Sequence, residues 1–271
     1  MTEFFSALMD PDSTFLRYAF VLGILSSIAF GMMGTYVVAR RISYMAASIS
    51  HCLLGGIGIA LYLQIEMELT WVDPMFGAVA AGLVTALIIG LVSLYGKERD
   101  DTVIGAVWVI GMAVGLLFIA KTRGYIDPMS YLFGNILFIE KNDLWLVLGL
   151  DILVIVLGIL FYNKFLAVCF DEEFARLRGV KVEFYYLLLL FLTALTVVLL
   201  VKVVGIVMVV ALLTLPAAVA GVFSKRLWQM MVLSVIFCIV FVSVGIGVSY
   251  VYDLPTGPII ILFAGMASTL L

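Results

Sequence analysis

The chain has 271 residues, of which 65% are hydrophobic and 12% are charged, and its formal net charge is -3 at pH 7. Soluble domains are about half apolar and about a quarter charged, so this composition excludes a soluble protein. The slightly negative charge also excludes a nucleic-acid surface as the main function. Apolar stretches of membrane-span length recur from end to end and predict a single transmembrane domain over residues 1–271.

Nine segments are apolar and long enough to be candidate membrane spans. They cover about residues 18–39, 42–63, 74–95, 102–120, 144–162, 184–201, 203–223, 228–251 and 257–271. The block 184–223 is roughly twice the length of one span of about 20 residues, and we expect it to fold as a hairpin near Lys202 and Gly205. The sequence therefore predicts an all-α, polytopic transmembrane bundle of about eight or nine helices.

Basic residues set the expected orientation, because cytoplasmic loops carry an excess of Lys and Arg. When Arg40 and Arg41 are placed in the cytoplasm, most basic residues fall on the same side, including those of segment 163–183. The connection 121–143 then lies outside. Its apolar part, 131–138, predicts a short helix at the outer interface that cannot span the membrane.

The segment 163–183 contains a helix pattern of its own. An N-capping residue, two acids for the first turn, a base for the last turn and a terminating glycine follow one another. These residues are Asp171, Glu172, Glu173, Arg176 and Gly179. They predict a short cytoplasmic helix over about 171–180, which is either a bland amphipathic helix at the interface or a surface presented to a soluble partner.

The segment 42–63 carries the only histidine of the chain, His51. In a helix its small and polar residues share one face, at alternating steps of four and three. These residues are Tyr44, Ser48, His51, Gly55, Gly58 and Tyr62. Such a face in a membrane span indicates contact with a partner or a pathway. We therefore expect His51 to contact the transported species; the alternative is a packed, hydrogen-bonded core residue.

A carboxylate also lies within a predicted span, Asp151 in 144–162. Because a charge in the bilayer is costly, Asp151 should face the bundle interior, either along a cation path or in a structural pair. Asp151 and His51 together would suit a self-sufficient secondary transporter, the alternative function. Such transporters commonly have paired, interrupted helices in two halves, and the sequence has no convincing pair of these.

Several stretches together resemble the membrane permease of bacterial metal-ion ABC importers, which carry zinc, manganese or iron(II). The resemblance extends over roughly residues 14–271. It rests on residues 34–41 followed by Ser50 and His51, on 131–137, on 170–180, on 202–218 and on 253–257.

The resemblance implies a multi-pass protein of the bacterial cytoplasmic membrane that is not itself an enzyme and holds no bound cofactor. The sequence has no GxxxxGK[ST] phosphate loop. ATP hydrolysis is expected in an ATP-binding partner subunit, with 171–180 as the coupling helix that contacts it. Further expected partners are a metal-binding extracytoplasmic receptor and a second permease copy or a related chain. A siderophore or cobalamin importer is a neighbouring alternative, but the small face around His51 favours a bare ion.

One position departs from the family pattern. The family commonly has an Asp four residues before the histidine, where this chain has Ala47. A lone imidazole is a weaker cation ligand than a carboxylate–imidazole pair. His51 is the predicted metal ligand, and further ligands are expected from Ser48, Met45, Cys52 and Asp151 or from the second subunit. The departure leaves zinc, manganese and iron all open as the transported ion.

Overall fold

The structure is a computed structural model and describes residues 14–69, 71–96, 100–124, 128–134, 141–199 and 201–269. Within these ranges every regular element is a helix. Seven described helices are long and apolar enough to cross a membrane, or eight when the bent pair Leu144–Leu160 and Tyr162–Phe170 counts as one span. The predicted all-α, polytopic membrane fold is therefore confirmed.

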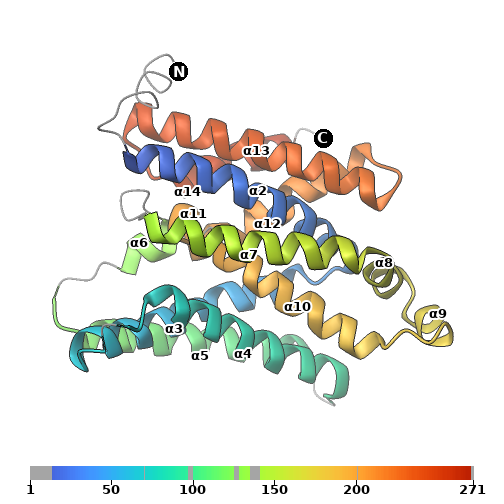
Figure 1. Ribbon diagram of the computed structural model, residues 1–271, viewed down its shortest axis with the longest axis horizontal. Coiled ribbons are helices and arrows are strands. Elements are labelled where there is room, and N and C mark those ends of the chain that lie inside the picture. Colours follow the sequence, from blue (N-terminus) through green and yellow to red (C-terminus); the bar gives the residue numbers. More distant parts are fainter. Residues whose placement is uncertain are drawn as a thin grey trace. The chain divides into compact units, whose positions relative to one another are not determined.

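The chain divides into two compact units, and Figure 1 labels the helices of both. The first unit contains helices α2 (Thr14–Arg40), α6 (Pro128–Phe133), α7 (Lys141–Leu160), α11 (Val201–Val204), α12 (Ile206–Phe223), α13 (Leu227–Tyr252) and α14 (Thr256–Thr269). The second contains α3 (Ser43–Glu66), α4 (Pro74–Tyr95), α5 (Asp100–Lys121), α8 (Tyr162–Phe170), α9 (Glu172–Leu177) and α10 (Val182–Leu199).

Each of the nine predicted spans coincides with a helix. The fifth predicted span corresponds to α7, and the helical stretch continues beyond the predicted end as α8, after a bend of 70°. The ninth corresponds to α14, which has 14 residues and is short for a full crossing. The predicted break in the block 184–223 is present, since α10 is followed by the single turn of α11 and then by α12; the hairpin itself stays a prediction.

Glycines bring α2 close to its neighbours within the first unit. A side chain on Gly31 would overlap the backbone of Val235 in α13, and one on Gly34 would overlap the carbonyl of Leu213 in α12. Tyr36 is fully buried, and its hydroxyl donates a hydrogen bond to the Gly158 carbonyl of α7 at 3.1 Å. Helices commonly pack in this way inside membranes, where the hydrophobic effect does not drive them together and small residues let their backbones approach closely.

A proline inside α12 is compensated by a cysteine of the neighbouring helix. Pro216 cannot donate to the carbonyl four residues earlier, which belongs to Leu212. The thiol of Cys238 in α13 lies 3.9 Å from that carbonyl oxygen and is its weak donor. A freed carbonyl in a membrane helix is tolerated where neighbouring protein satisfies it, and here α13 does so.

Three stretches of the first unit that are distant in sequence meet at one point, which we call the Gly205 corner (residues 132–134, Val204, Gly205 and Gly257). Gly205 precedes α12 with a positive φ of 88°, and a side chain there would overlap the backbone of residues 132–134. Gly257, in the first turn of α14, lies against the carbonyls of Phe133 and Val204. The short helix predicted within 121–143 is present as α6; residues 135–138 lie outside the described part of the chain.

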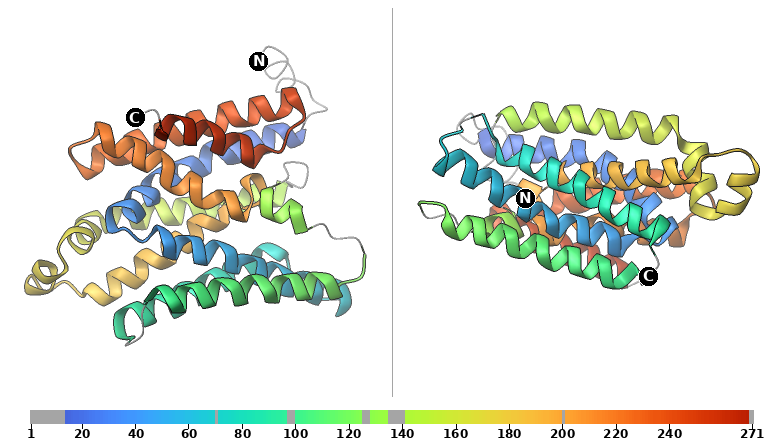
Figure 2. Two further views of the ribbon diagram at one scale, coloured as in Figure 1. Left: turned by 180° about the vertical axis from the view of Figure 1, so that it is seen from behind. Right: turned by 90° about the horizontal axis from the view of Figure 1, so that it is seen from below.

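In the second unit, α3 lies between α4 and α5 (Figure 2). Helix α4 begins at a capped turn, where Asp73 accepts a hydrogen bond from the Met75 amide at 2.7 Å and Pro74 occupies the first position. It runs antiparallel to α3, with Gly56 against Gly77. Helix α5 instead runs parallel to α3. Near the start of both helices Ser48 is hydrogen-bonded to Ile104, and near their ends the Tyr62 ring contacts the Phe118 ring.

Candidate functional site

His51 lies near the middle of α3 and is stacked against Trp108 of α5. The two ring centroids are 4.3 Å apart and the ring planes differ by 10°. Only 8% of the histidine is exposed, and its Nδ1 atom is buried without a hydrogen-bond partner among the described residues. A buried polar group without a partner is unfavourable; the ion contact and the packed core residue both remain predictions for His51.

The whole polar face of α3 meets α5. Ser48 donates to the carbonyl of Ile104 at 3.0 Å, and Tyr62 makes an edge contact with Phe118. Between these contacts, two glycines of α3 lie against two glycines of α5, and we call these four residues the glycine seam: Gly55, Gly58, Gly111 and Gly115. A side-chain carbon on Gly55 would lie 2.8 Å from the Gly111 carbonyl oxygen, and one on Gly58 would lie 2.5 Å from that of Gly115.

Three of the other predicted ligands are hydrogen-bonded to neighbours. The hydroxyl of Ser48 is bonded to α5, as described, and the thiol of Cys52 donates to the Val107 carbonyl of the same helix at 3.1 Å. The sulfur of Met45 accepts a hydrogen bond from the Tyr186 hydroxyl of α10 at 3.1 Å. The structure therefore places Ser48, His51 and Cys52 against α5, while Met45 is bonded to α10.

The last predicted pathway residue, Asp151, belongs to α7 in the first unit. It is 2% exposed, which confirms that this carboxylate faces the protein interior. Its carboxyl group interacts with the backbone of Ala29 in α2, while Oδ1 has no hydrogen-bond partner in the described part of the chain. Asp151 thus shares with His51 the property of a buried polar atom without a partner.

No complete metal site is formed in this structure by the residues that it describes. Within them, no group of three or more His, Cys, Asp and Glu side chains could hold an ion. Structural zinc sites use four protein ligands. The described residues around His51 do not form such a four-ligand site.

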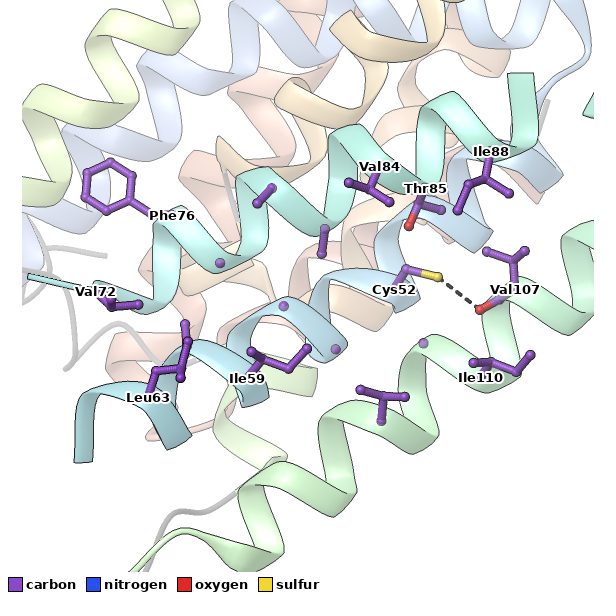
Figure 3. Close-up of a pocket in the computed structure, with 18 of the residues that line it drawn as sticks. Cys52, Ile59, Leu63, Val72, Phe76, Val84, Thr85, Ile88, Val107 and Ile110 are labelled. Carbon is purple, nitrogen blue, oxygen red and sulfur yellow. Dashed lines mark hydrogen bonds between the residues drawn. The ribbon is translucent and has the colours of Figure 1, made fainter. Parts of the chain in front are cut away.

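An apolar pocket of about 740 Å³ lies over α3, between α4 and α5 (Figure 3). Its floor includes Cys52, Gly55 and Gly56, and the flanking helices contribute aliphatic side chains such as Val84 and Ile110. The described residues that line it include no charged side chain.

The helix predicted over about 171–180 is present as α9. The Asp171 side chain accepts a hydrogen bond from the Phe174 amide at 2.9 Å, as an N-cap does. The helix ends in a Schellman motif: the amide of Val180 donates to the Ala175 carbonyl, that of Gly179 donates to Arg176, and Gly179 has a φ of 74°. The predicted cap and terminating glycine are both confirmed.

Helix α9 presents apolar side chains to its surroundings and is held in place by ion pairs. Phe174 and Leu177 are 49% and 87% exposed. Glu172 pairs with Arg40, the last residue of α2, and Arg176 pairs with Glu183 of α10 at 2.9 Å. Exposed aromatic and aliphatic groups surrounded by charges are typical of a protein-binding surface.

A series of contacts connects α9 to α3 within the second unit. The Arg40 guanidinium that pairs with Glu172 also lies over the Tyr186 ring, 5.5 Å from its centroid. The Tyr186 hydroxyl in turn bonds to Met45 of α3 and to Ser93 of α4. The helix that carries His51 is thereby linked through side chains to the exposed helix.

The sequence matches the ABC 3 transport family over residues 12–270. This chain belongs to that family. A probable metal transport system membrane protein of Chlamydia pneumoniae is 39% identical over 92% of this chain and 85% of its own. A manganese transport system membrane protein, MntC, of Halalkalibacterium halodurans is 35% identical over 97% of this chain and 88% of its own. The resemblance to metal-ion ABC permeases is confirmed, and the chain is a multi-pass cell-membrane protein.

Two solved structures share this fold. The structure of PsaBC from Streptococcus pneumoniae in complex with Fab contains a chain with a TM-score of 0.88 and 29% identity, matched over 99% of this chain and 94% of that one. An inward-facing putative metal-chelate type ABC transporter matches with a TM-score of 0.74 at 13% identity, over 97% of this chain and 90% of that one. The second likeness concerns the fold alone.

Two residues of this ABC 3 family member were not singled out as site residues by the sequence reasoning. Trp108 covers His51, and Arg40 pairs with Glu172. A signal for the first did exist, because Trp108, Gly111, Gly115 and Phe118 repeat the spacing of large and small residues on the α3 face. Arg40 was recognised only as a basic residue that sets membrane orientation, since a partner so far along the sequence leaves no local pattern.

Proposed function

We propose that this chain is the membrane permease subunit of an ABC importer for a divalent transition-metal ion, with manganese as the first cargo to test. The observation that carries the proposal is the nearly full-length match, at 29% identity and a TM-score of 0.88, to a chain of the PsaBC structure. Relatives that bear manganese transport names support manganese in particular. Zinc and iron(II) are the alternative cargos.

The proposed assembly has three further kinds of component. An ATP-binding subunit on the cytoplasmic side hydrolyses ATP, a metal-binding receptor outside delivers the ion, and a second permease copy or a related chain completes the membrane part. In this proposal α9 is the coupling helix that contacts the ATP-binding subunit. Its exposed Phe174 and Leu177 and its charged residues support that role, because they form the kind of mixed surface that binds proteins.

His51 and Asp151 are the proposed contacts for the ion. Each has a buried polar atom that no described residue satisfies, whereas Ser48, Met45 and Cys52 are already hydrogen-bonded. An imidazole suits zinc or iron, and carboxylate oxygens suit manganese. A carboxylate from the second subunit would therefore supply what Ala47 does not, and few ligands at a time would allow release.

Coupling between ATP and transport is proposed to pass through Arg40. Movement of α9 would act on Glu172, and the same guanidinium contacts Tyr186, which is bonded to α3 through Met45. Such a contact series supports coupling only when substitutions along it change the response. The proposal therefore needs a direct test at these residues.

The first experiment measures uptake of manganese, zinc and iron(II) in parallel by cells that express the chain with its ATP-binding subunit and receptor. We expect His51→Ala and Asp151→Asn to abolish uptake of one ion while expression and assembly stay normal. Ser50→Ala is the matched control, because its hydroxyl bonds only to the Ala46 carbonyl of its own helix. Unchanged uptake in His51→Ala would make the histidine a packing residue, and uptake without the ATP-binding subunit would favour a secondary transporter.

The second experiment tests the coupling helix. The triple variant Glu172→Ala/Glu173→Ala/Arg176→Ala should lose uptake and bind the ATP-binding subunit more weakly, while the chain remains in the membrane. Lys225→Ala is the control, because it removes a charge from the connection between α12 and α13. Uptake and assembly at the wild-type level in the triple variant would contradict the assignment of α9.

A further inference from the structure

The Nδ1 atom of His51 cannot accept a cation in the arrangement of this structure. This atom is buried, and the indole of Trp108 covers one face of the ring at a centroid distance of 4.3 Å. A metal ion binds in the plane of an imidazole at about 2.0–2.1 Å from the nitrogen, so the ion needs an open approach to that atom. Some element must move before His51 can act.

The structure indicates which element that is. The apolar part of α5 is 17% buried, against 78% for α3, and α5 has its main contact with α3 and a smaller one with α4. Along the glycine seam the backbones approach each other closely at Gly55, Gly58 and Gly115, whereas Gly111 lies against the Cys52 side chain. Small residues at a helix contact permit close approach, and they offer little steric resistance to sliding.

Trp108 is the large side chain that covers His51 on this contact. Its indole N–H is bonded to the Met112 sulfur at 3.3 Å, which is within α5 itself, so Trp108 would move together with its helix. Tyr44 flanks it on the α3 side at a centroid distance of 6.1 Å. A shift of α5 would therefore remove the cover from His51 and leave the internal support of Trp108 unchanged.

We infer that Trp108 is the residue that closes the ion site at His51, and that α5 must shift along the glycine seam before a cation can reach the imidazole. The inference rests on the proposed function, because it takes His51 as an ion contact. It adds a residue and a moving helix that neither the resemblance nor the relatives' names specify. In the inferred movement α3 and α5 stay in contact, and only the stacking of Trp108 on His51 is lost.

Accessibility of position 51 tests the closure without any cargo. The variant His51→Cys, in a chain whose three native cysteines are replaced by alanine, is treated in assembled transporter with methanethiosulfonate ethylammonium, a small cationic thiol reagent. We expect slow modification when Trp108 is present and severalfold faster modification in Trp108→Ala, because the indole would no longer cover position 51. Trp108→Phe should restore slow modification, and Trp145→Ala is the control because that side chain is 68% exposed on α7.

A cross-link tests the movement. An ideal Cβ at Gly111 lies 3.0 Å from the Cβ of Cys52, slightly closer than the usual disulfide spacing of about 3.5–4.5 Å. Gly111→Cys, with Cys169 and Cys238 replaced by alanine, should lose uptake on oxidation and recover it on reduction. The pair Ser249→Cys/Thr256→Cys, in a chain whose three native cysteines are replaced by alanine, is the control lock, since these hydroxyls are 3.0 Å apart between α13 and α14.

The outcomes separate the two ideas. Equal modification rates with and without Trp108, or full uptake by the oxidised Gly111→Cys protein, would overturn the closure while leaving the metal assignment intact. Unchanged uptake in His51→Ala would instead overturn the ion contact, whatever the accessibility assay gives. If Gly111→Cys does not fold, the accessibility assay alone decides, because it leaves the glycine seam unchanged.

Discussion

Two contacts in this protein depend on glycine, and they differ in kind. At the glycine seam, four glycines with ordinary helical backbones allow α3 and α5 to lie face to face. At the Gly205 corner, a glycine with a φ of 88° stands between two helices, and the backbone of residues 132–134 lies directly against it. The first contact repeats along two helices, whereas the second is a single fixed point.

The difference concerns what each contact permits. Helices that meet backbone to backbone along a line can shift without breaking the hydrogen bonds inside each helix; between α3 and α5, the bonds that a shift must exchange are those of Ser48 and Cys52. A residue with positive φ enclosed by backbone cannot shift without changing the direction of the chain. The corner is therefore expected to set the fold of the first unit, and the seam to allow movement in the second.

The largest effect is expected at the corner. Gly205→Ala places a side chain in a left-handed backbone conformation and against the backbone of residues 132–134. The conformation alone costs about 1–2 kcal/mol, and the overlap adds to it, so the thermal midpoint in detergent should fall steeply or the protein should not accumulate. Gly149→Ala is the control, because nothing lies within 4 Å of that position. Equal stability of the two variants would contradict a fixed corner.

A smaller effect on stability, with a larger one on transport, is expected at the seam. Gly58→Ala would push its helix away from the Gly115 carbonyl, and overpacking of this kind costs about 1–3 kcal/mol. We expect a modest loss of thermal stability and a marked loss of metal uptake. Gly105→Ala is the matched control on α5, where the closest atom is the Tyr44 hydroxyl at 3.4 Å. Normal uptake in a Gly58→Ala protein that folds would argue against a moving seam.

The N-cap of α9 extends the comparison to an exposed helix, whereas the glycine seam and the Gly205 corner are both enclosed. Asp171→Ala removes the bond to the Phe174 amide and should cost about 1 kcal/mol of local helix stability. Hydrogen exchange of α9 amides and binding of the ATP-binding subunit measure this. Asp171→Asn keeps a capping oxygen and should behave like the wild type; if both variants behave alike, the cap does not matter for α9.

The smallest effect on stability is expected for the ion pair of Arg176 with Glu183. Both side chains are partly exposed, at 54% and 38%, so Arg176→Ala should change the free energy of unfolding by no more than about 1 kcal/mol. Its effect on uptake should be larger than its effect on stability if α9 contacts a partner. A double-variant cycle with Glu183→Ala separates the pair from the partner contact; identical uptake in all variants would remove Arg176 from the coupling surface.

Much of the fold was predictable from the sequence. The nine spans, the break before α12 and the short helices α6 and α9 all follow from hydrophobic length and local capping signals, which act over a few residues. The site was predicted less completely. Ser48, His51 and Cys52 do lie against one helix, but Met45 is bonded to α10 because residues six positions apart point in different directions.

The sequence by itself determined that this is a polytopic helical membrane protein of a metal-permease type, with a capped helix at 172–177 and a polar face around His51. These properties depend on composition, periodicity and local hydrogen bonds. Only the tertiary structure decided that Trp108 covers His51, that Arg40 holds Glu172 and that three separate stretches meet at Gly205. His51 and Trp108 are 57 positions apart in the sequence, and Arg40 and Glu172 are 132 positions apart. A local sequence pattern carries no information about which distant part of the chain will approach a given side chain.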